Sequence, residues 1–230
     1  GPTAQALAEA DLALSLGYHA GLLSLAAFRG ATDDLLLAHC QQVAERIPVV
    51  GFYLQPAVGG RVLSYDFWRR FVEIENVVAI KIAPFNRYYT IDVVRAVAEA
   101  GRGNEIALYT GNDDNIVNDL ITDYRFAEDA VPLHFVGGLL GQWAVWAKCA
   151  VDVLQEIQQQ RATNTVDYRR WLTYNTQLTE ANAAVFDAAH DYRGCLPGIH
   201  WVLQQQGLMR STWTLNPEEL ERMCANNQIC

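Results

Sequence analysis

Lysine is scarce in this chain, and one of its lysines lies where a positive charge is costly. The 230 residues include 17 lysines and arginines, of which only Lys81 and Lys148 are lysines. Lys81 lies within the apolar run Val77 to Ala83, which has the composition of a buried strand. Burial of an ammonium group disfavours its charged form and lowers its pKa. A neutral amine is a nucleophile that forms Schiff bases with carbonyl compounds, so this chemistry is predicted for Lys81.

A tyrosine occupies a matching place earlier in the chain. Tyr53 lies three residues before Pro56, as Lys81 lies three residues before Pro84. Proline usually closes a strand, so both side chains are expected near the C-terminal ends of strands. If the two strand faces that hold them point into one interior, a phenol and an amine share one cavity. The phenol would then pass protons to and from the carbinolamine that precedes a Schiff base.

Both residues also have a structural interpretation. Lys81 would then be a structural lysine paired with a buried carboxylate, because structural ion pairs also place charges in protein interiors. Tyr53 would be a core aromatic residue whose hydroxyl finds a hydrogen-bond partner. The five histidines lack the spacing of metal ligands and are interpreted as structural, so no metal site is predicted.

The elements that would position these residues follow a regular rhythm. Five apolar runs, about 28 residues apart, are predicted to be strands. They begin near Ala20, Pro48, Val77, Asn104 and Pro132. Segments with helical spacing lie between them, with Thr32, Ser64 and Thr90 as predicted N-caps and a shorter helix over residues 114–120. Apolar strands that alternate with helices indicate right-handed βα units around a parallel sheet.

Two parallel architectures fit this rhythm, an open doubly wound α/β sheet and a (β/α)8 barrel. The chain opens with a helix predicted from Thr3 to Leu16, whereas an open five-stranded α/β domain normally starts with its own strand. We therefore predict a (β/α)8 barrel, or TIM barrel, with about five of its eight βα units in this chain. The other three units would then precede Gly1.

The chain changes to a helical pattern after Gly141. Helices are predicted over residues 142–160, 167–190, 196–206 and 217–223. The predicted domains are a partial barrel from residue 1 to 160 and a C-terminal helical extension from residue 161 to 230. Such an extension can pack against the barrel or against another subunit.

Composition argues against several classes of partner. The net charge of −9 argues against nucleic acid, because phosphate binding favours a basic face. No apolar stretch approaches the roughly 20 residues of a membrane-spanning helix, so no membrane partner is expected. The five cysteines are scattered and lack a CxxC pair, which is typical of reduced thiols in the cytosol, and a cytoplasmic location is predicted.

Two segments resemble a known enzyme family. IPVVGFYLQP and VVAIKIAP are similar to the tyrosine strand and the lysine strand of the dihydrodipicolinate synthase/N-acetylneuraminate lyase family of class I aldolases. The later segments fit in the same order, with a Thr-Gly-Asn-Asp turn at 110–113 and a last strand over 134–138. The resemblance runs from Ala4 to Trp213 and implies the fourth to eighth strands of the family's TIM barrel.

The resemblance also implies an activity and a site. Lys81 would form a Schiff base with pyruvate or another 2-keto acid, and Tyr53 would be the proton relay. The implied substrate-binding residues are Gly111, Asn112, Gln55 and Gly137. No metal or organic cofactor is implied, because the lysine itself supplies the electron sink. The implied assembly is a homo-oligomer, either a dimer or a tetramer.

Some segments depart from the family pattern. The Gly-Thr-Thr-Gly-Glu-type loop that holds the keto-acid carboxylate has no counterpart from Gly1 onward. Ala26, Ala27 and Phe28 stand where synthases usually carry a tyrosine, and Arg61 is a displaced counterpart of the synthase arginine. These departures argue against a standard dihydrodipicolinate synthase and leave the second substrate open.

The sequence therefore predicts a Schiff-base lyase or aldolase that acts on pyruvate or another 2-keto acid. Two alternatives stay open. One is a non-catalytic barrel that uses its helices for binding or assembly. The other is a hydratase-aldolase or decarboxylase that uses the same lysine.

Overall fold

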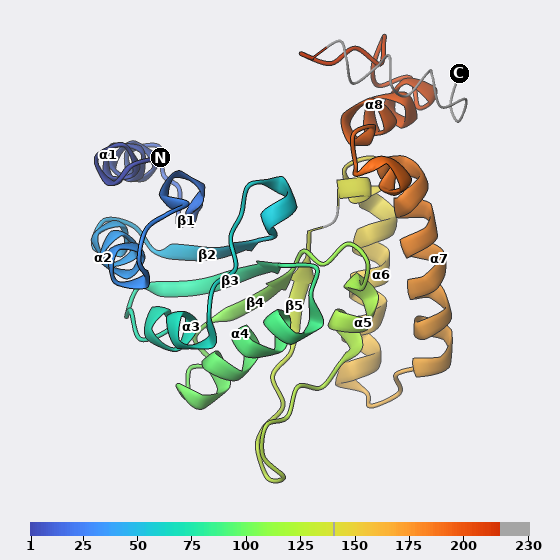
Figure 1. Cartoon of the computed structure of the whole chain (residues 1–230). Helices are drawn as coiled ribbons and strands as arrows, with labels where there is room; N and C mark the ends of the chain where they lie inside the picture. The colour runs from blue at the N-terminus through green and yellow to red at the C-terminus, as the bar shows by residue number, and fades with distance from the viewer. Residues whose placement is uncertain (140, 217–230) are drawn as a thin grey trace. The chain divides into compact units, whose positions relative to one another are not determined.

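The computed structural model describes residues 1–139 and 141–216 (Figure 1). They form two compact units. The first holds residues 1–112 and 122–138, and the second holds residues 113–121, 139 and 141–216. Each unit is described by itself. The domain boundary predicted at residue 160 stays a prediction.

The first unit is built on one parallel sheet. Its five strands follow the predicted order: β1 (Gly21–Leu23), β2 (Val49–Leu54), β3 (Val77–Ala83), β4 (Ala107–Thr110) and β5 (Phe135–Gly138). Each strand pairs in parallel with the next one along the chain, so the order in the sheet is β1-β2-β3-β4-β5. A doubly wound sheet reverses its strand order at a switch point, whereas a barrel keeps it sequential. The sequential order is that of a (β/α)8 barrel, although the sheet does not close within the described residues.

Helices α1 (Thr3–Ser15), α2 (Asp33–Ala44), α3 (Tyr65–Phe71) and α4 (Arg87–Glu99) complete the first unit, and Figure 1 shows α2, α3 and α4 following one another along the sheet. The N-caps predicted at Thr32 and Ser64 are confirmed, because each hydroxyl accepts a hydrogen bond from the backbone N–H three residues later. These caps begin the helices that cover the outer face of β2 and β3.

The N-cap predicted at Thr90 is wrong. Helix α4 begins three residues earlier, at Arg87, and Asn86 is its N-cap. The Asn86 side chain accepts hydrogen bonds from the backbone N–H groups of Tyr88 and Tyr89. Thr90 lies within the first turns of the helix, and its hydroxyl donates to the Asn86 carbonyl at 3.0 Å. Asparagine is at least as good an N-cap as threonine, which accounts for the earlier start of this helix.

The core of the first unit lies between the sheet and helices α2, α3 and α4. On β2, buried and half-buried residues alternate, and Val49, Gly51 and Tyr53 form the buried set. Trp68 and Phe71 of α3 are buried against this face. A Cβ atom at Gly51 would lie 2.7 Å from the Phe71 ring, so only glycine admits the helix this closely.

The second unit is helical. It contains α5 (Ile116–Ile121), α6 (Ala147–Ala162), α7 (Tyr168–Phe186) and α8 (Cys195–Gln205). The Asn175 side chain of α7 accepts hydrogen bonds from the N–H groups of Val117 and Asn118 at the start of α5. An amide oxygen thus satisfies N–H groups that have no partner within the helix.

The predicted helix ends in this unit need two corrections. The helix expected from residue 142 begins only at Ala147, and a 3-10 turn over 141–144 precedes it. The helix expected to reach residue 190 ends at Phe186, because Asp187 adopts the left-handed conformation with φ 57°. The helix predicted over 196–206 is observed one residue earlier, and the one predicted over 217–223 lies outside the described residues.

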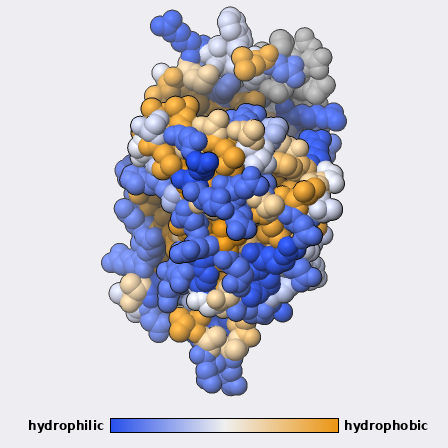
Figure 2. Space-filling model, turned by 90° about the vertical axis from the view of Figure 1, so that its left-hand side faces the viewer, coloured by the Kyte–Doolittle hydropathy of each residue, from blue (hydrophilic) through white to orange (hydrophobic). Residues whose placement is uncertain are grey.

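Apolar side chains also lie on the surface of the first unit. Helix α1 exposes Leu12 and Leu14, its C-cap residue Leu16 is exposed as well, and Leu35 of α2 is 61% exposed. Figure 2 shows apolar side chains on the side of the molecule where these helices lie.

None of the helices described in residues 1–139 and 141–216 is both long and apolar enough to cross a membrane.

We expect a buried histidine to make the first unit sensitive to acid. His39 of α2 is 2% exposed, and its Nδ1 lies 2.9 Å from the Thr3 hydroxyl of α1. Burial lowers the pKa of His39 below the ordinary value of 6.5. Below about pH 6.5 the unfolded chain binds a proton at this position that the native state does not bind. As the pH is lowered below about 6.5, the free energy of unfolding is therefore expected to decrease. It should level off at a lower pH, once the histidine of the native state is also protonated.

Urea titrations across this pH range measure the effect. The His39→Gln variant should lose less stability on acidification than the wild type. His19→Gln is the matched control, because His19 is exposed and should leave the acid response unchanged. A His39→Gln variant with the full wild-type response would contradict the assignment.

Candidate active site

Lys81 lies on the C-terminal half of the central strand of the sheet. It is half-buried and is the fifth of the seven residues of β3. Its Nζ lies 4.7 Å from the centroid of the Phe52 ring on β2. The parallel register pairs Lys81 with Phe52 on one side and with Tyr109 of β4 on the other. Residues paired in this way point to the same face, so the amine lies in a row of side chains on the face opposite the buried core.

Tyr53 does not share this face. It pairs with Ile82, and Gly51 pairs with Ile80, so these four residues lie on the buried face toward the helices. The Tyr53 ring lies 5.2 Å from Trp68 of α3, measured between ring centroids. The prediction of one cavity for Tyr53 and Lys81 is therefore wrong in its geometry.

The cause is an irregularity at the start of the two strands. Val49 pairs with Val77, but Val50 pairs with Ala79, so Val78 is an extra residue on β3. Without this bulge, the spacing of 28 residues would place Tyr53 beside Lys81. One extra residue moves the later side chains of the strand to the opposite face relative to the neighbouring strand, because side chains alternate with a period of two.

The Tyr53 hydroxyl is hydrogen-bonded to the backbone of the loop that follows β2. It donates to the Leu63 carbonyl and accepts from the Leu63 N–H, each at 3.2 Å. The residue is fully buried, and burial raises the pKa of Tyr53 to about 12. The structural interpretation of this residue is thus the one that its contacts support. Tyr53 fastens residues 55–64 to the sheet.

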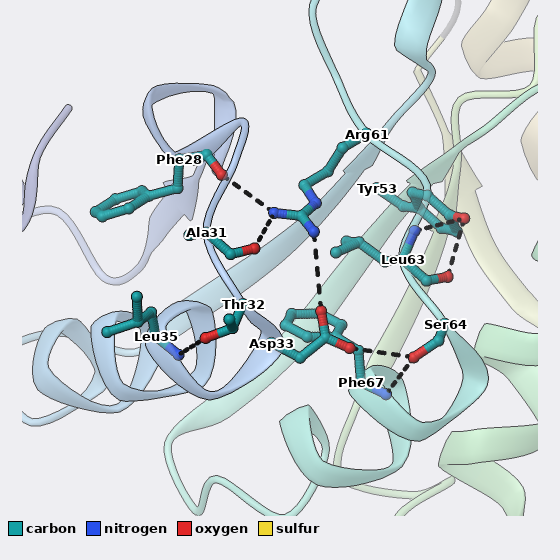
Figure 3. A network of polar contacts seen from close by, with 10 residues as sticks. All are labelled: Phe28, Ala31, Thr32, Asp33, Leu35, Tyr53, Arg61, Leu63, Ser64 and Phe67. Atoms are coloured by element: carbon teal, nitrogen blue, oxygen red, sulfur yellow. Dashed lines mark hydrogen bonds and ion pairs between the residues drawn. The ribbon is translucent and has the colours of Figure 1, made fainter.

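Arg61 fastens the same loop to the segment after β1 (Figure 3). Its Nη1 donates to the carbonyls of Phe28 at 3.1 Å and Ala31 at 2.8 Å, and its Nη2 lies 3.9 Å from an Asp33 carboxylate oxygen. Asp33 in turn accepts a hydrogen bond from the Ser64 hydroxyl. Arg61, the displaced counterpart of the synthase arginine, therefore joins the loops that follow β1 and β2.

Removal of this clamp is expected to loosen the loop. Hydrogen bonds from a charged donor are worth about 1.5–3 kcal/mol, so Arg61→Ala should raise local opening of residues 55–64 by about tenfold or more. Limited proteolysis followed by mass spectrometry measures cleavage in this segment. Arg29→Ala is the matched control, because Arg29 is exposed and should not change the cleavage rate. Equal cleavage of the Arg61 and Arg29 variants would contradict the role.

A recess lies between these loops on the face that carries Lys81. Phe52 and Leu54 of β2 line it from the sheet, and Arg29 and Arg61 line it from the loops. Its cavity volume is only about 20 Å³, which is roughly the room for one water molecule, and Lys81 is not among its lining residues. Of its two guanidinium groups, that of Arg61 is held by the Phe28 and Ala31 carbonyls and lies 3.9 Å from the Asp33 carboxylate.

The predicted substrate-binding residues after β2 and β4 make backbone hydrogen bonds to neighbouring segments. Gln55 donates its N–H to the Ala83 carbonyl, and its own carbonyl accepts from Gly60. Gly111 donates its N–H to the Ile82 carbonyl at 2.8 Å. These bonds hold the ends of the strands together.

Asn112 is 3% exposed and connects three segments. Its side-chain oxygen accepts from the Phe85 N–H at 3.1 Å, and its Nδ2 donates to the Thr90 hydroxyl at 3.1 Å. Phe85 has a positive φ of 50°, which is uncommon for an aromatic residue and needs such support. Asn112 therefore orders the loop after β3, and its substrate contact stays a prediction.

Gly137 lies in the same row of residues as Lys81. Between them lies Tyr109, which was not predicted from the sequence as a site residue. Tyr109 pairs with Lys81 on one side and with Gly137 on the other. A Cβ atom at Gly137 would lie 2.5 Å from the Cζ and the hydroxyl oxygen of Tyr109, so the tyrosine ring lies over the backbone of β5. The available signal was the position of Tyr109 two residues before the Gly-Asn turn, at the end of its strand.

The side chains of this row contain an amine and a phenol but no metal-binding cluster. Within the described part of the chain, no group of three or more histidine, cysteine and acidic residues is arranged to hold a metal ion. What the row offers chemically is a nucleophile, a hydroxyl and an aromatic wall.

Comparisons with known proteins place this fold. No family model matches the chain, and no curated protein matches it in sequence. Solved structures do match. A chloride-inhibited dihydrodipicolinate synthase from Acinetobacter baumannii in complex with pyruvate has a TM-score of 0.67 and 20% identity, over 97% of this chain and 70% of that one. The fold is that of the dihydrodipicolinate synthase and N-acetylneuraminate lyase structures.

Two further structures agree. A 2-keto-3-deoxygluconate aldolase variant from Sulfolobus solfataricus has a TM-score of 0.64 and 15% identity, over 98% of this chain and 69% of that one. The N-acetylneuraminate lyase from Mycoplasma synoviae has a TM-score of 0.60 and 13% identity, over 98% of this chain and 68% of that one. The fold implied by the sequence resemblance is thus confirmed.

Proposed function

We propose that this chain belongs to the dihydrodipicolinate synthase/N-acetylneuraminate lyase family and carries the nucleophile of a Schiff-base lyase or aldolase. The observation that carries the proposal is the position of Lys81. It lies on the C-terminal half of a central barrel strand, on the face away from the buried core. Catalytic residues of barrel enzymes come from this end of the strands.

The proposed substrate is pyruvate or another 2-keto acid. The solved structures similar to this chain act on or contain such compounds by their names: one holds pyruvate, and another is a 2-keto-3-deoxygluconate aldolase. Arg29 lines a small recess on the same face of the sheet, and a guanidinium group attracts carboxylates.

The proposed chemistry needs no cofactor. The Lys81 amine adds to the keto carbon, and loss of water gives a Schiff base. Once protonated, this group withdraws electrons from the neighbouring carbon–carbon bond, which can then be broken or formed. The Phe52 ring lies against Nζ and supplies an apolar wall beside the reacting amine.

Borohydride trapping tests the proposal. The protein is incubated with borohydride and either pyruvate or one of a panel of other 2-keto acids, and its peptides are then analysed by mass spectrometry. The expected result is a reduced adduct on the peptide that contains Lys81. The other lysine is an internal control, because Lys148 is exposed and paired with Asp152 and should stay unmodified. No adduct with any keto acid, or equal labelling of both lysines, would refute the proposal and favour a non-catalytic barrel.

We also propose that the chain assembles as a cytoplasmic homo-oligomer, a dimer or a tetramer. The exposed leucines of α1 support contact with a second copy, because monomers rarely expose contiguous apolar surface. Cys40, Cys149 and Cys195 form no disulfide among the described residues, which suits a reducing compartment. Light scattering measures the assembly, and Leu12→Glu should shift it toward the monomer.

A further inference from the structure

Tyr109 is the hydroxyl-bearing residue nearest to Lys81 in the register of the sheet. The two residues pair directly across β3 and β4, so they point to the same face. Strands of one sheet lie about 4.8 Å apart, which brings neighbouring side chains of one face within reach of a common ligand. This placement follows from the backbone pairing alone.

The sheet gives the Tyr109 ring a defined place. An irregularity between Leu108 and Tyr109 shifts the register so that Tyr109 faces Gly137, where a side chain is absent. The ring lies over that glycine, since a Cβ atom there would meet its Cζ and hydroxyl oxygen at 2.5 Å. Lys81 leans the other way, toward Phe52. The phenol thus lies toward β5 and the amine toward β2, so a ligand that touches both would bridge β3 and β4.

The Tyr109 hydroxyl is available for a ligand, whereas that of Tyr53 is not. Tyr109 is half-buried, and within residues 1–139 and 141–216 its hydroxyl has no hydrogen-bond partner. The Tyr53 hydroxyl is bonded to both backbone groups of Leu63 on the other face of the sheet. A half-buried phenol can bond to water, and a ligand that binds beside it can take the place of that water.

We propose that Tyr109 is the general acid and base of the Lys81 reaction, in the role that the sequence assigned to Tyr53. The inference rests on the proposed function, since it requires a Schiff base at Lys81. The amine nitrogen bonds to the keto carbon and passes a proton to its oxygen, which gives a carbinolamine. Its carbon–oxygen bond then breaks, and the departing hydroxide takes the Tyr109 proton and leaves as water. The phenolate recovers a proton from water when the adduct is hydrolysed or released.

The test compares rates of adduct formation rather than final yields. Tyr109→Phe keeps the ring over Gly137 and removes only the hydroxyl. With pyruvate and borohydride, the wild type and this variant should both reach full labelling of Lys81, but the variant should do so about 10²-fold more slowly. Tyr53→Phe, compared at equal amounts of folded protein, should not show this loss. A Tyr109→Phe rate equal to the wild-type rate, or a slow Tyr53→Phe with a normal Tyr109→Phe, would overturn the inference.

A second measurement tests the inference in case the Tyr109→Phe variant does not fold. Replacement of Tyr109 by 3,5-difluorotyrosine changes two ring hydrogens and lowers the pKa of the phenol. The alkaline limb of the rate–pH profile for adduct formation should then move to lower pH, whereas a merely structural tyrosine would leave it in place. Absence of any adduct in the wild type would instead refute the Schiff base itself, so the two proposals fail in distinguishable ways.

Discussion

Lys81→Arg is expected to abolish adduct formation and to reduce turnover of any keto-acid substrate by at least about 10³-fold. Arginine keeps the positive charge beside Phe52 and the length of the side chain, but its guanidinium stays protonated and is not a nucleophile. Lys81→Met, which removes the charge as well, should give the same loss. The measurements are the mass of the trapped protein and the steady-state rate with the keto acid that labels the wild type.

The matched control is Lys148→Arg. Lys148 is 86% exposed and pairs with Asp152 four residues on, so this substitution should preserve labelling and turnover. Stability should change little in the Lys81 variants, because a cation over an aromatic ring contributes only about 0.5–1 kcal/mol. A Lys81→Arg protein that is still labelled, or that retains turnover, would show that the chemistry lies elsewhere.

Tyr53→Ala is expected to lower the free energy of unfolding of the first unit by about 3–5 kcal/mol, because it empties a fully buried site against Trp68 and Tyr89. Tyr53→Phe should cost about 1–3 kcal/mol, because it leaves the N–H and carbonyl of Leu63 without their buried partner. Urea unfolding measures both values. Tyr88→Phe is the control, because Tyr88 is 80% exposed. The free energy of unfolding of this variant should lie within about 0.5 kcal/mol of the wild-type value.

The same residue predicts an alkaline limit. Burial raises the pKa of Tyr53 from 10 to about 12, so between these values the unfolded chain loses a proton that the native state keeps. Stability should therefore fall as pH rises from about 10 to about 12, and Tyr53→Phe should lack this component. If Tyr53→Phe matches the wild type in both stability and alkaline response, the clamp on Leu63 has no energetic role.

Much of the fold is readable from the sequence because it depends on local signals. Five continuous apolar runs predicted five parallel strands, since strands covered by helices on one side and by a barrel interior on the other have little need of polar residues. Thr32 and Ser64 marked helix starts because an N-cap acts within three residues of itself. Helix ends were less readable: the left-handed Asp187 that stops α7 has no sequence signature as strong as a glycine.

The sequence by itself determined that Lys81 is unusual and that it lies near the end of a buried strand, because the scarcity of lysine and the apolar run are properties of the chain. Only the tertiary structure decided which residues accompany it. The extra residue Val78 shifts β3 by one position against β2, which turns Tyr53 toward the helices and brings Phe52 beside the amine. A second shift at Leu108 places Tyr109 over Gly137. Such bulges arise from pairing between distant segments and leave no local mark, yet with a side-chain period of two each one decides which face a residue joins.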